Sequence, residues 1–471
     1  MNKTWQKKLI VYSLGLALGY EASKLLGRRI VRDVGTDAIK TIMTDLYDQN
    51  LWEFVSAATR FTPQIIVETN LRSQEGKVIE RPLGPPKKFP SLDQLMFGIG
   101  QFHVMPTPLE ETVDTKVVIG KACKRPLVID LPIMISAMAY GEAISEKAKV
   151  ALAKGSAMAG TATNTGEGPF LPSERKAANK LILQYNRGSW NKTEDIISQA
   201  DAIEIQFGQG AIGGVGHRLS AKKIDSKLRK GFGLAPGQDA VAHSRQPEVN
   251  HPSELPKLIR KLKEIAGDIP VGVKLGAGKY LEKDLEWAVD GGADFIAIEG
   301  GDGATRGSAP ILQDDFGVPT VFAIARAGEF FRKHRLRDRV SLISVGKIRT
   351  PGDVLKALAL GADAVYMGAI ALFAMSHTQV LKALPFEPPT QIVWYDGKYA
   401  DRFNVAEGGK SLYKFLKSCK EEIIEGVRAL GKTSVGQVDK EDLFALDELI
   451  AKGVGVPMAY EPYIPGKQIT Y

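Results

Sequence analysis

The stretch "PVGVKLGAGKYLEKDLEWAVDGGADFIAIEGGDG", residues 270–303, holds two short apolar runs around an amphipathic segment. The runs at 270–275 and 294–300 are almost continuously apolar, which is typical of strands buried on both faces of a parallel sheet. Between them, "EKDLEWAVDGGA" predicts a crossover helix that ends in Gly-Ala-Asp just before the second strand. The stretch therefore predicts one strand–helix–strand unit of an α/β protein.

The same alternation extends over residues 133–368. We expect eight strands, at 133–137, 157–164, 202–207, 270–275, 294–300, 319–324, 340–345 and 363–368. Eight strands with crossover helices favour a closed (β/α)8 barrel, or TIM barrel, over an open doubly wound sheet. The loops after the strands form the active site of such a barrel, so functional residues are expected there.

Flanking segments extend the barrel on both sides. The 471 residues suit a TIM barrel of roughly 250 residues with extensions. We expect an N-terminal, largely helical extension over 1–84, the barrel over 85–400 and a C-terminal helical extension over 401–471. An apolar run at 9–19 is shorter than the roughly 20 residues that span a bilayer. A docked or membrane-surface helix with peripheral contact through residues 5–20 is therefore favoured over a true anchor.

The composition narrows the class of protein. Hydrophobic residues make up 44% and charged residues 25% of the chain, as in soluble globular proteins. The net charge of +8 is mild and spread along the chain, so it does not argue for nucleic acid and supports at most a weak preference for anionic small molecules. Cys123 and Cys419 are too few for a cysteine-ligated iron–sulfur cluster or a four-cysteine zinc site. They indicate a reducing, cytoplasmic location.

The segment "EIQFGQGAIGGVG", residues 204–216, has the glycine spacing of a dinucleotide-binding loop. That motif also needs a helix starting on the last glycine and an acidic residue about twenty positions later. Neither follows, because glycines and a proline interrupt the next stretch and Asp225 has no strand before it. The spacing alone therefore does not predict a nicotinamide site.

Three glycine-rich segments follow late strands, at 299–310, 344–353 and 366–372. Glycines let backbone N–H groups approach a phosphate, and a helix N-terminus adds a favourable partial charge. The usual phosphate site of a TIM barrel lies after strands seven and eight. These segments therefore predict a phosphate site, with tight turns alone as the alternative.

Charged residues near strand ends are the catalytic candidates. Lys274 lies in an otherwise apolar strand, where it needs either a structural ion-pair partner or a role as a cation beside a phosphate-anchored cofactor. Asn164 and Glu167 follow the second expected strand. For Glu167, proton transfer or ammonium binding competes with a solvated loop charge. The six histidines show no paired spacing, so we expect no metal site.

Six segments, in order, resemble the FMN-binding synthase domain of glutamate synthase, over roughly residues 85–400. "SAMAYGEAISEKAKVALAKGSAMAGTATNTGEG" resembles that family's "MSFGA…S…NTGEGG", and "IEIQFGQGA" resembles its "QIKxAQGA". "VGVKLGAG", "GGDGAT", "LRDRVSLISVGKIRTPGD" and "LALGADAVYMGAIAL" resemble its "VSVKLV", "GHDGGT", "LRDRVxLxADGGLKTGxD" and "LGAEEFGFGTAAL". The resemblance implies an FMN-binding barrel.

The resemblance also implies roles for individual residues. Glu167 would handle a proton on the substrate side, and Lys274 would stabilise the reduced flavin. Gln206, which stands where the family has a strand lysine, is a third catalytic candidate. Besides Glu167, we expect Arg218 and Arg306 to contact the substrate, because they would restore positive charge that the family's lysines supply. The implied FMN contacts are Ala137, Met138, Asn164, Lys274, Gly301, Asp302, Gly303, Gly346, Lys347, Gly368 and Ala369.

The substrate side departs from the family pattern. Where the family loop continues "QGAKPGEGGQLPG", this chain has Ile212 for the lysine, Val215 for the glutamate and Arg218 for the glutamine. Gln206 replaces a strand lysine, and Val345 replaces the acidic residue before "GGLKTG". The three cysteines of the family's iron–sulfur cluster are missing, and no glutaminase segment is expected before the barrel. The flavin pocket is therefore expected to follow the family more closely than the substrate pocket.

The function that the resemblance implies is an FMN-dependent oxidoreductase. It would reduce an imino or keto acid, such as 2-oxoglutarate with ammonia, and take electrons from an external donor, either a ferredoxin or a reductase subunit. A homo-oligomer is expected. Two alternatives stay open: an FMN-dependent hydroxy-acid or diphosphate enzyme on the same barrel, and a flavin-binding subunit of a larger complex.

Overall fold

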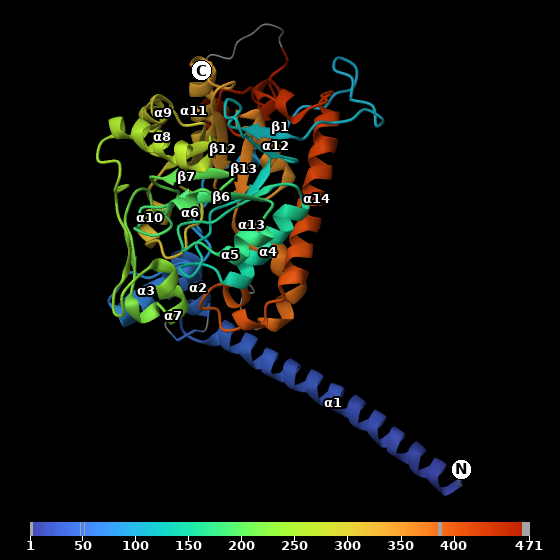
Figure 1. Cartoon of the computed structure of the whole chain (residues 1–471). Helices are drawn as coiled ribbons and strands as arrows, with labels where there is room; N and C mark the ends of the chain where they lie inside the picture. The colour runs from blue at the N-terminus through green and yellow to red at the C-terminus, as the bar shows by residue number, and fades with distance from the viewer. Residues whose placement is uncertain (1–2, 48, 51, 385–388, 464–471) are drawn as a thin grey trace. The chain divides into compact units, whose positions relative to one another are not determined.

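The computed structural model describes residues 3–47, 49–50, 52–384 and 389–463, with side chains described from residue 22 onward. The chain divides into two units, Met1–Ile79 and Glu80–Tyr471. Figure 1 shows the elements of both units in the order of the chain.

The first unit is helical, which confirms the expected N-terminal helical extension. Its helices are α1 (Lys3–Thr44), α2 (Trp52–Phe61) and α3 (Pro63–Glu75). The third helix begins with Pro63 after Thr62, whose side chain accepts a hydrogen bond from the Ile65 amide, and ends at the left-handed Gly76.

The N-terminal apolar run lies in α1. No helix in the described part of the chain is both long enough and apolar enough to cross a membrane. The side chains of residues 5–20 lie outside the described residues, so their contact with a membrane surface stays a prediction.

The second unit contains the barrel predicted from the sequence. Eight parallel strands form one sheet in the order β4-β13-β12-β11-β10-β7-β6-β5. The first and last strands of this order are β4 and β5. They come together at a hydrogen bond in which the Thr161 hydroxyl, next to β5, donates to the Ile133 carbonyl oxygen of β4 at 2.5 Å. The strands are β4 (Ile133–Ile135), β5 (Ala162–Asn164), β6 (Lys180–Tyr185), β7 (Ala202–Gln206), β10 (Val271–Gly276), β11 (Phe295–Glu299), β12 (Ser341–Val345) and β13 (Ala364–Met367).

One predicted strand is wrong and one strand was missed. Residues 320–324 of the predicted strand 319–324 begin helix α11 (Thr320–Lys333), and the strand Lys180–Tyr185 was not predicted. A short apolar run does not distinguish a strand from the buried side of a helix, and the run at 319–324 supplies the buried side of α11. The two errors leave the count at eight but shift the order, so the loop after Gln206 follows the fourth barrel strand. The expected strand 157–164 also begins too early, because α4 ends at Met158.

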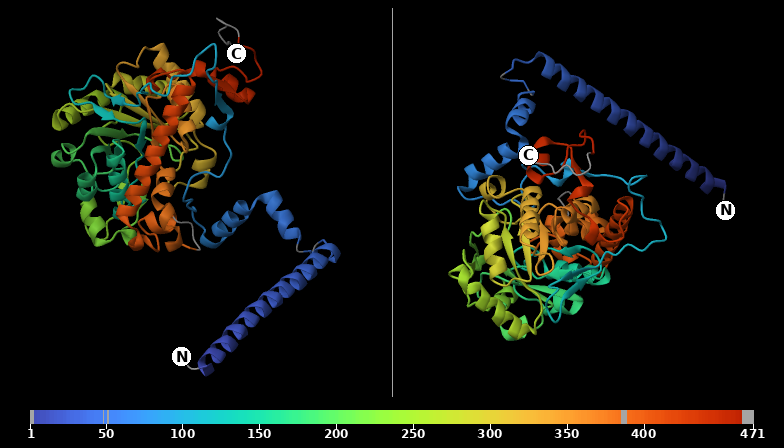
Figure 2. Two further views of the ribbon diagram at one scale, coloured as in Figure 1. Left: turned by 90° about the vertical axis from the view of Figure 1, so that its right-hand side faces the viewer. Right: turned by 90° about the horizontal axis from the view of Figure 1, so that it is seen from above.

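Helices cover the outside of the barrel. The longest of them in this unit, α14 (Val405–Ala429), belongs to the C-terminal extension and packs along α4 (Glu146–Met158), α13 (Ala369–Ser376) and α12 (Pro351–Ala359). Figure 2 shows it running along one side of the barrel. Its buried stripe includes Leu412, Leu416, Cys419, Ile423 and Val427, a helical spacing of three and four residues. This apolar face joins the C-terminal extension to the barrel core.

The remaining elements surround the barrel. The helices are α4 (Glu146–Met158), α5 (Pro172–Ala177), α6 (Glu194–Ile197), α7 (Ser226–Phe232), α8 (Leu255–Ala266), α9 (Leu281–Asp290), α10 (Pro310–Asp314), α12 (Pro351–Ala359), α13 (Ala369–Ser376), α14 (Val405–Ala429) and α15 (Glu448–Val454). Short antiparallel pairs join β1 (Leu95–Phe97) to β14 (Leu443–Ala445), β2 (Val117–Ile119) to β3 (Leu127–Ile129), and β8 (His217–Leu219) to β9 (Ala240–Ala242).

Candidate active site

A cavity of about 540 Å³ opens at the carboxyl ends of the barrel strands. This volume is in the range of small-molecule and cofactor sites. The predicted site residues that line it are Ala137, Met138, Glu167, Arg218, Lys274, Arg306, Gly368 and Ala369. The predicted residues that do not line it are Asn164, Gln206, Gly301, Asp302, Gly303, Gly346 and Lys347.

The loop that carries Glu167 is held from several sides. The Gly166 amide donates to the Asn164 side chain at 2.9 Å, and the Trp190 indole donates to the Glu167 carbonyl oxygen at 2.6 Å. Gly166 has a φ of +68°, and a Cβ atom there would meet the Met138 backbone at 2.5 Å. Asn164 therefore acts on the site through the loop, and Gly166 cannot be replaced without moving it.

The Glu167 carboxylate faces the cavity with a fixed neighbour. Gln206 lies at the end of β7, and its amide Nε2 donates to Glu167 Oε2 at 3.0 Å. The same amide contacts Gln209 Oε1 at 3.3 Å. Gln206 therefore orients the carboxylate without lining the cavity itself.

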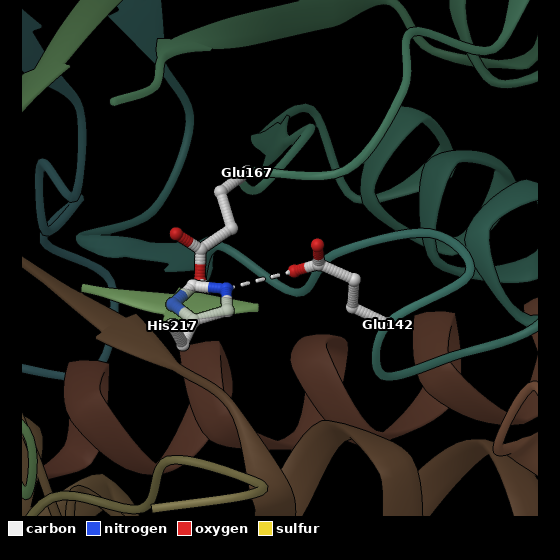
Figure 3. Close-up of side chains that lie close together, drawn as sticks. All are labelled: Glu142, Glu167 and His217. Atoms are coloured by element: carbon white, nitrogen blue, oxygen red, sulfur yellow. Dashed lines mark hydrogen bonds and ion pairs between the residues drawn. The ribbon is translucent and has the colours of Figure 1, made fainter. Parts of the chain in front are cut away.

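Two further residues complete a cluster that the sequence did not predict (Figure 3). His217 Nε2 lies 3.2 Å from Glu142 Oε2 and 3.7 Å from Glu167 Oε1. Burial would lower the pKa of His217, but the Glu167 and Glu142 carboxylates outweigh it and raise the pKa to about 9. Burial raises the pKa of Glu142 above its ordinary range, although the bond to His217 opposes this shift. The imidazole is therefore protonated at neutral pH.

Sequence reasoning missed Glu142 and His217 because they carry no local motif. Glu142 and Glu167 lie in the loops after β4 and β5, and His217 begins β8 in the segment after β7, so the barrel brings all three to one end. The available signal was that each of them follows a barrel strand.

Lys274 lines the cavity and also has a structural ion-pair partner. Its Nζ lies 2.9 Å from Glu299 Oε2, and both side chains are almost completely buried. Burial would lower the pKa of Lys274, but Glu299, Glu204 and Glu167 together raise it. Lys274 is therefore charged and has the structural ion pair considered from the sequence, whereas its role as a cation beside a cofactor stays a prediction.

A buried polar layer lies beneath Lys274. Glu204, on β7, is fully buried and accepts hydrogen bonds from Asn164 at 3.1 Å and Gln184 at 2.8 Å. Burial and the Glu204 carboxylate raise the pKa of Tyr366 well above its usual value, so this phenol stays protonated. Buried polar groups that are hydrogen-bonded to one another rigidify a core. This layer gives the floor of the cavity a fixed arrangement.

Asp302 and Gly346 pack against the start of α11. Asp302 Oδ1 accepts hydrogen bonds from the Thr320 amide at 2.8 Å and the Thr320 hydroxyl at 2.6 Å. A Cβ atom on Gly346 would lie 2.7 Å from the same hydroxyl. These contacts give Asp302 and Gly346 a role in packing the loops against α11. This role corresponds to the alternative interpretation of the glycine-rich segments, in which they form tight turns.

The two arginines predicted to meet substrate differ in their surroundings. Arg306 donates to both carboxylate oxygens of Asp396 at 2.6 and 2.7 Å, and its guanidinium lies 4.1 Å from the centre of the Trp394 ring. The Arg218 side chain is 67% exposed, and its Nη1 lies 3.4 Å from Asp239 Oδ2. Arg218 is therefore the freer cation of the two.

The start of α13 can receive a phosphate. Gly368 precedes the helix, whose first amides have no partner within the helix. A Cβ atom on Gly368 would meet only Ser136, at 3.6 Å, so the backbone is accessible from the cavity. Unpaired amides at a helix N-terminus bind anions. The residues here fit a phosphate-bearing cofactor, and Lys274 lies on β10, three strands along the sheet from β13, the strand before this helix.

The fold and the cavity define the class of TIM-barrel proteins whose active sites lie at the carboxyl ends of the strands. The chain belongs to the glutamate synthase family: residues 98–433 match the conserved region in glutamate synthase. The family resemblance seen in the sequence is thereby confirmed.

Individual relatives agree with this assignment. The chain is 32% identical to a glutamate synthase large subunit-like protein of Rhizobium meliloti, over 82% of this chain and 91% of that protein. It is 31% identical to an archaeal-type glutamate synthase (NADPH) of Thermotoga sp., over 69% of this chain and 64% of that protein. A flavocytochrome b2 variant with pyruvate bound superposes with a TM-score of 0.50 at 19% identity, covering 80% of this chain and 83% of that one, and shows the fold alone.

Proposed function

We propose that this protein is an FMN-dependent oxidoreductase that reduces an imino or keto acid. The observation that carries the proposal is one cavity lined by an accessible helix N-terminus at Gly368, a buried cation at Lys274 and a carboxylate at Glu167. Bound reduced FMN would supply the hydride. Membership of the glutamate synthase family supports both the cofactor and the substrate class.

Each residue has a distinct task in this proposal. The first amides of α13 hold the cofactor phosphate, and the Lys274 ammonium stabilises negative charge on the reduced ring. Arg218 and Lys223, both exposed at the cavity, attract the carboxylate of the substrate. Glu167 delivers a proton to the substrate atom that gains the electron pair. The electrons come from an external donor, either a ferredoxin or a reductase subunit.

The substrate is expected to be less anionic than 2-oxoglutarate. Ile212 is buried and lines the cavity at the position where the family segment has a lysine. A second carboxylate would meet this apolar side chain, which offers it no hydrogen bond.

Reoxidation of the photoreduced protein by a panel of keto acids with ammonium tests the proposed function. Cofactor released by heat should first co-migrate with FMN. Monocarboxylic keto acids should then reoxidise the protein faster than 2-oxoglutarate, and glutamine should not replace ammonium. A protein without flavin would contradict the function, whereas a tenfold advantage for 2-oxoglutarate would contradict only the substrate preference.

Opposite substitutions in the Lys274–Glu299 pair should shift the flavin midpoint potential in opposite directions. Lys274→Met keeps much of the stem volume but removes the cation, so the reduced flavin should lose stabilisation and the potential should fall. Glu299→Gln leaves Lys274 without its counter-charge, so the potential should rise. Spectroscopic titration against reference dyes measures both values. Unchanged potentials in both variants would assign Lys274 a purely structural role.

A further inference from the structure

His217 stands between two carboxylates at the edge of the cavity (Figure 3). Its Nε2 atom faces Glu142 Oε2 at 3.2 Å and Glu167 Oε1 at 3.7 Å. The other Glu167 oxygen is taken by the Gln206 amide. The Glu167 oxygen toward His217 is therefore the one through which a proton can pass, after a small approach of the two side chains.

The charged groups around His217 favour its protonated form. Glu142 comes from the loop after β4, Glu167 from the loop after β5 and Arg187 from the loop after β6. The two carboxylates raise the pKa of His217, whereas burial and Arg187 lower it. Arg187 is itself held by hydrogen bonds to the Gly214 and Val215 carbonyl oxygens, which fixes the loop before His217.

His217 also has access to solvent. Its side chain is 29% exposed, whereas the side chains of Glu142 and Glu167 are 11% and 12% exposed. His217 lines the cavity and its Nδ1 atom is buried, so water in the cavity would exchange the proton at Nε2.

We propose that His217 is a proton-relay residue that returns a proton to Glu167 in each turnover, while Glu142 holds the imidazolium in place. The inference rests on the proposed function, in which Glu167 protonates the substrate. No motif marked His217 in the sequence, and its role follows from its contacts with Glu142 and Glu167.

Bound reduced flavin would supply a hydride to the carbon of the C=N or C=O bond, which leaves the π electron pair on nitrogen or oxygen. That atom takes a proton from Glu167, which takes the Nε2 proton of His217, and water reprotonates His217. A nitrogen or oxygen anion is a far stronger base than imidazole, so the overall proton transfer is downhill.

The same three side chains have donor types that a divalent cation can use. The His217 Nε2 atom, however, lies within hydrogen-bond distance of Glu142 Oε2, at 3.2 Å, and the Gln206 amide occupies one oxygen of Glu167. Both contacts use atoms that a metal ion would need as ligands. They favour the proton relay over a metal centre.

The first test measures the histidine itself and does not depend on turnover. NMR of the histidine-labelled, FMN-loaded protein should show His217 titrating near pH 9, well above its ordinary value of 6.5. Glu142→Gln should lower this midpoint by at least one pH unit. His243→Gln, an exposed histidine after β9, is the matched control for assignment and should leave the His217 midpoint unchanged. An ordinary midpoint for His217 would overturn the proposal.

Stability should follow the same titration. Because the folded pKa of His217 lies above 6.5, its ion pairs stabilise the fold fully below that pH, and this stabilisation is lost as the pH rises through about 9. The difference in melting temperature between the unaltered protein and His217→Gln should therefore be larger at pH 6 than at pH 10. An equal difference at both values would contradict an imidazolium in this cluster.

The second test measures the relay. His217→Ala should slow reoxidation of the reduced flavin at least tenfold at neutral pH, and added imidazole should restore much of the rate. A slow variant that imidazole does not rescue, while its FMN content and fold are intact, would assign His217 a structural role. Stoichiometric retention of Zn²⁺ or Mn²⁺ by the unaltered protein, lost in His217→Ala, would identify a metal centre and overturn the relay. Absence of flavin would instead defeat the proposed function and leave the NMR result standing.

Discussion

Glu167→Gln is expected to lower turnover by about 10²–10⁴-fold while the protein keeps its flavin, since that is the usual contribution of a general acid or base. The amide has the shape of the carboxyl group but cannot carry the proton that the substrate needs. Its oxygen can still accept the hydrogen bond that Gln206 now gives to Glu167 Oε2. The variant therefore separates proton transfer from the packing of the loop.

Rapid-mixing measurement of flavin reoxidation by the best keto acid gives the rate, and the visible absorbance gives the flavin content. Glu421→Gln makes the same chemical change on the exposed face of α14 and should leave the rate unchanged. Glu167→Asp retains a proton-carrying group on a shorter side chain, so its reoxidation rate should lie between the rates of Glu167→Gln and the control variant. Near-normal turnover in Glu167→Gln would return this residue to the role of a solvated loop charge.

Sequence patterns predicted the barrel because the strands buried on both faces are almost purely apolar, as in "VGVKL" and "SLISV". They failed at 319–324, where a β-branched and aromatic run lies in a helix, and at Lys180–Tyr185, whose polar ends disguised a buried strand. Only tertiary packing decides such short runs.

The sequence likewise predicted some residues of the candidate site and missed others. Lys274 and Glu167 could be predicted as candidates because a charged side chain in or just after an apolar barrel strand is costly to bury unless it is paired. Glu142 and His217 were not, because a carboxylate and an imidazole that meet across loops leave no periodic signal. The contacts that occupy Asp302 and Arg306 were equally hidden, since their partners lie at Thr320 and Asp396.

A buried ion pair behind the Glu167 loop carries the largest expected effect on stability. Lys149, on α4, is fully buried and lies 2.8 Å from Glu174 Oε1. Its Nζ also donates to the carbonyl oxygens of Asn164 at 2.7 Å and Thr165 at 3.0 Å. Burial lowers the pKa of Lys149 and raises that of Glu174, so desolvation offsets much of their attraction. The net attraction between the two charges therefore contributes little to stability. The pair contributes mainly because each charge neutralises the other and because Lys149 donates hydrogen bonds to the loop backbone.

Lys149→Met should therefore lower the free energy of unfolding by about 3–5 kcal/mol, the usual cost of leaving one partner of a buried pair uncompensated. Urea denaturation measures the loss, and Lys154→Met, an exposed lysine on the same helix, should change it by no more than about 0.5 kcal/mol. Adding Glu174→Leu to Lys149→Met removes the orphaned carboxylate, so part of the stability should return. The recovery should stay incomplete, because the Asn164 and Thr165 carbonyl oxygens still lack their donor. Full recovery would show that the lysine serves only Glu174, whereas a persistent deficit together with slower turnover would show that it also holds the Glu167 loop in place.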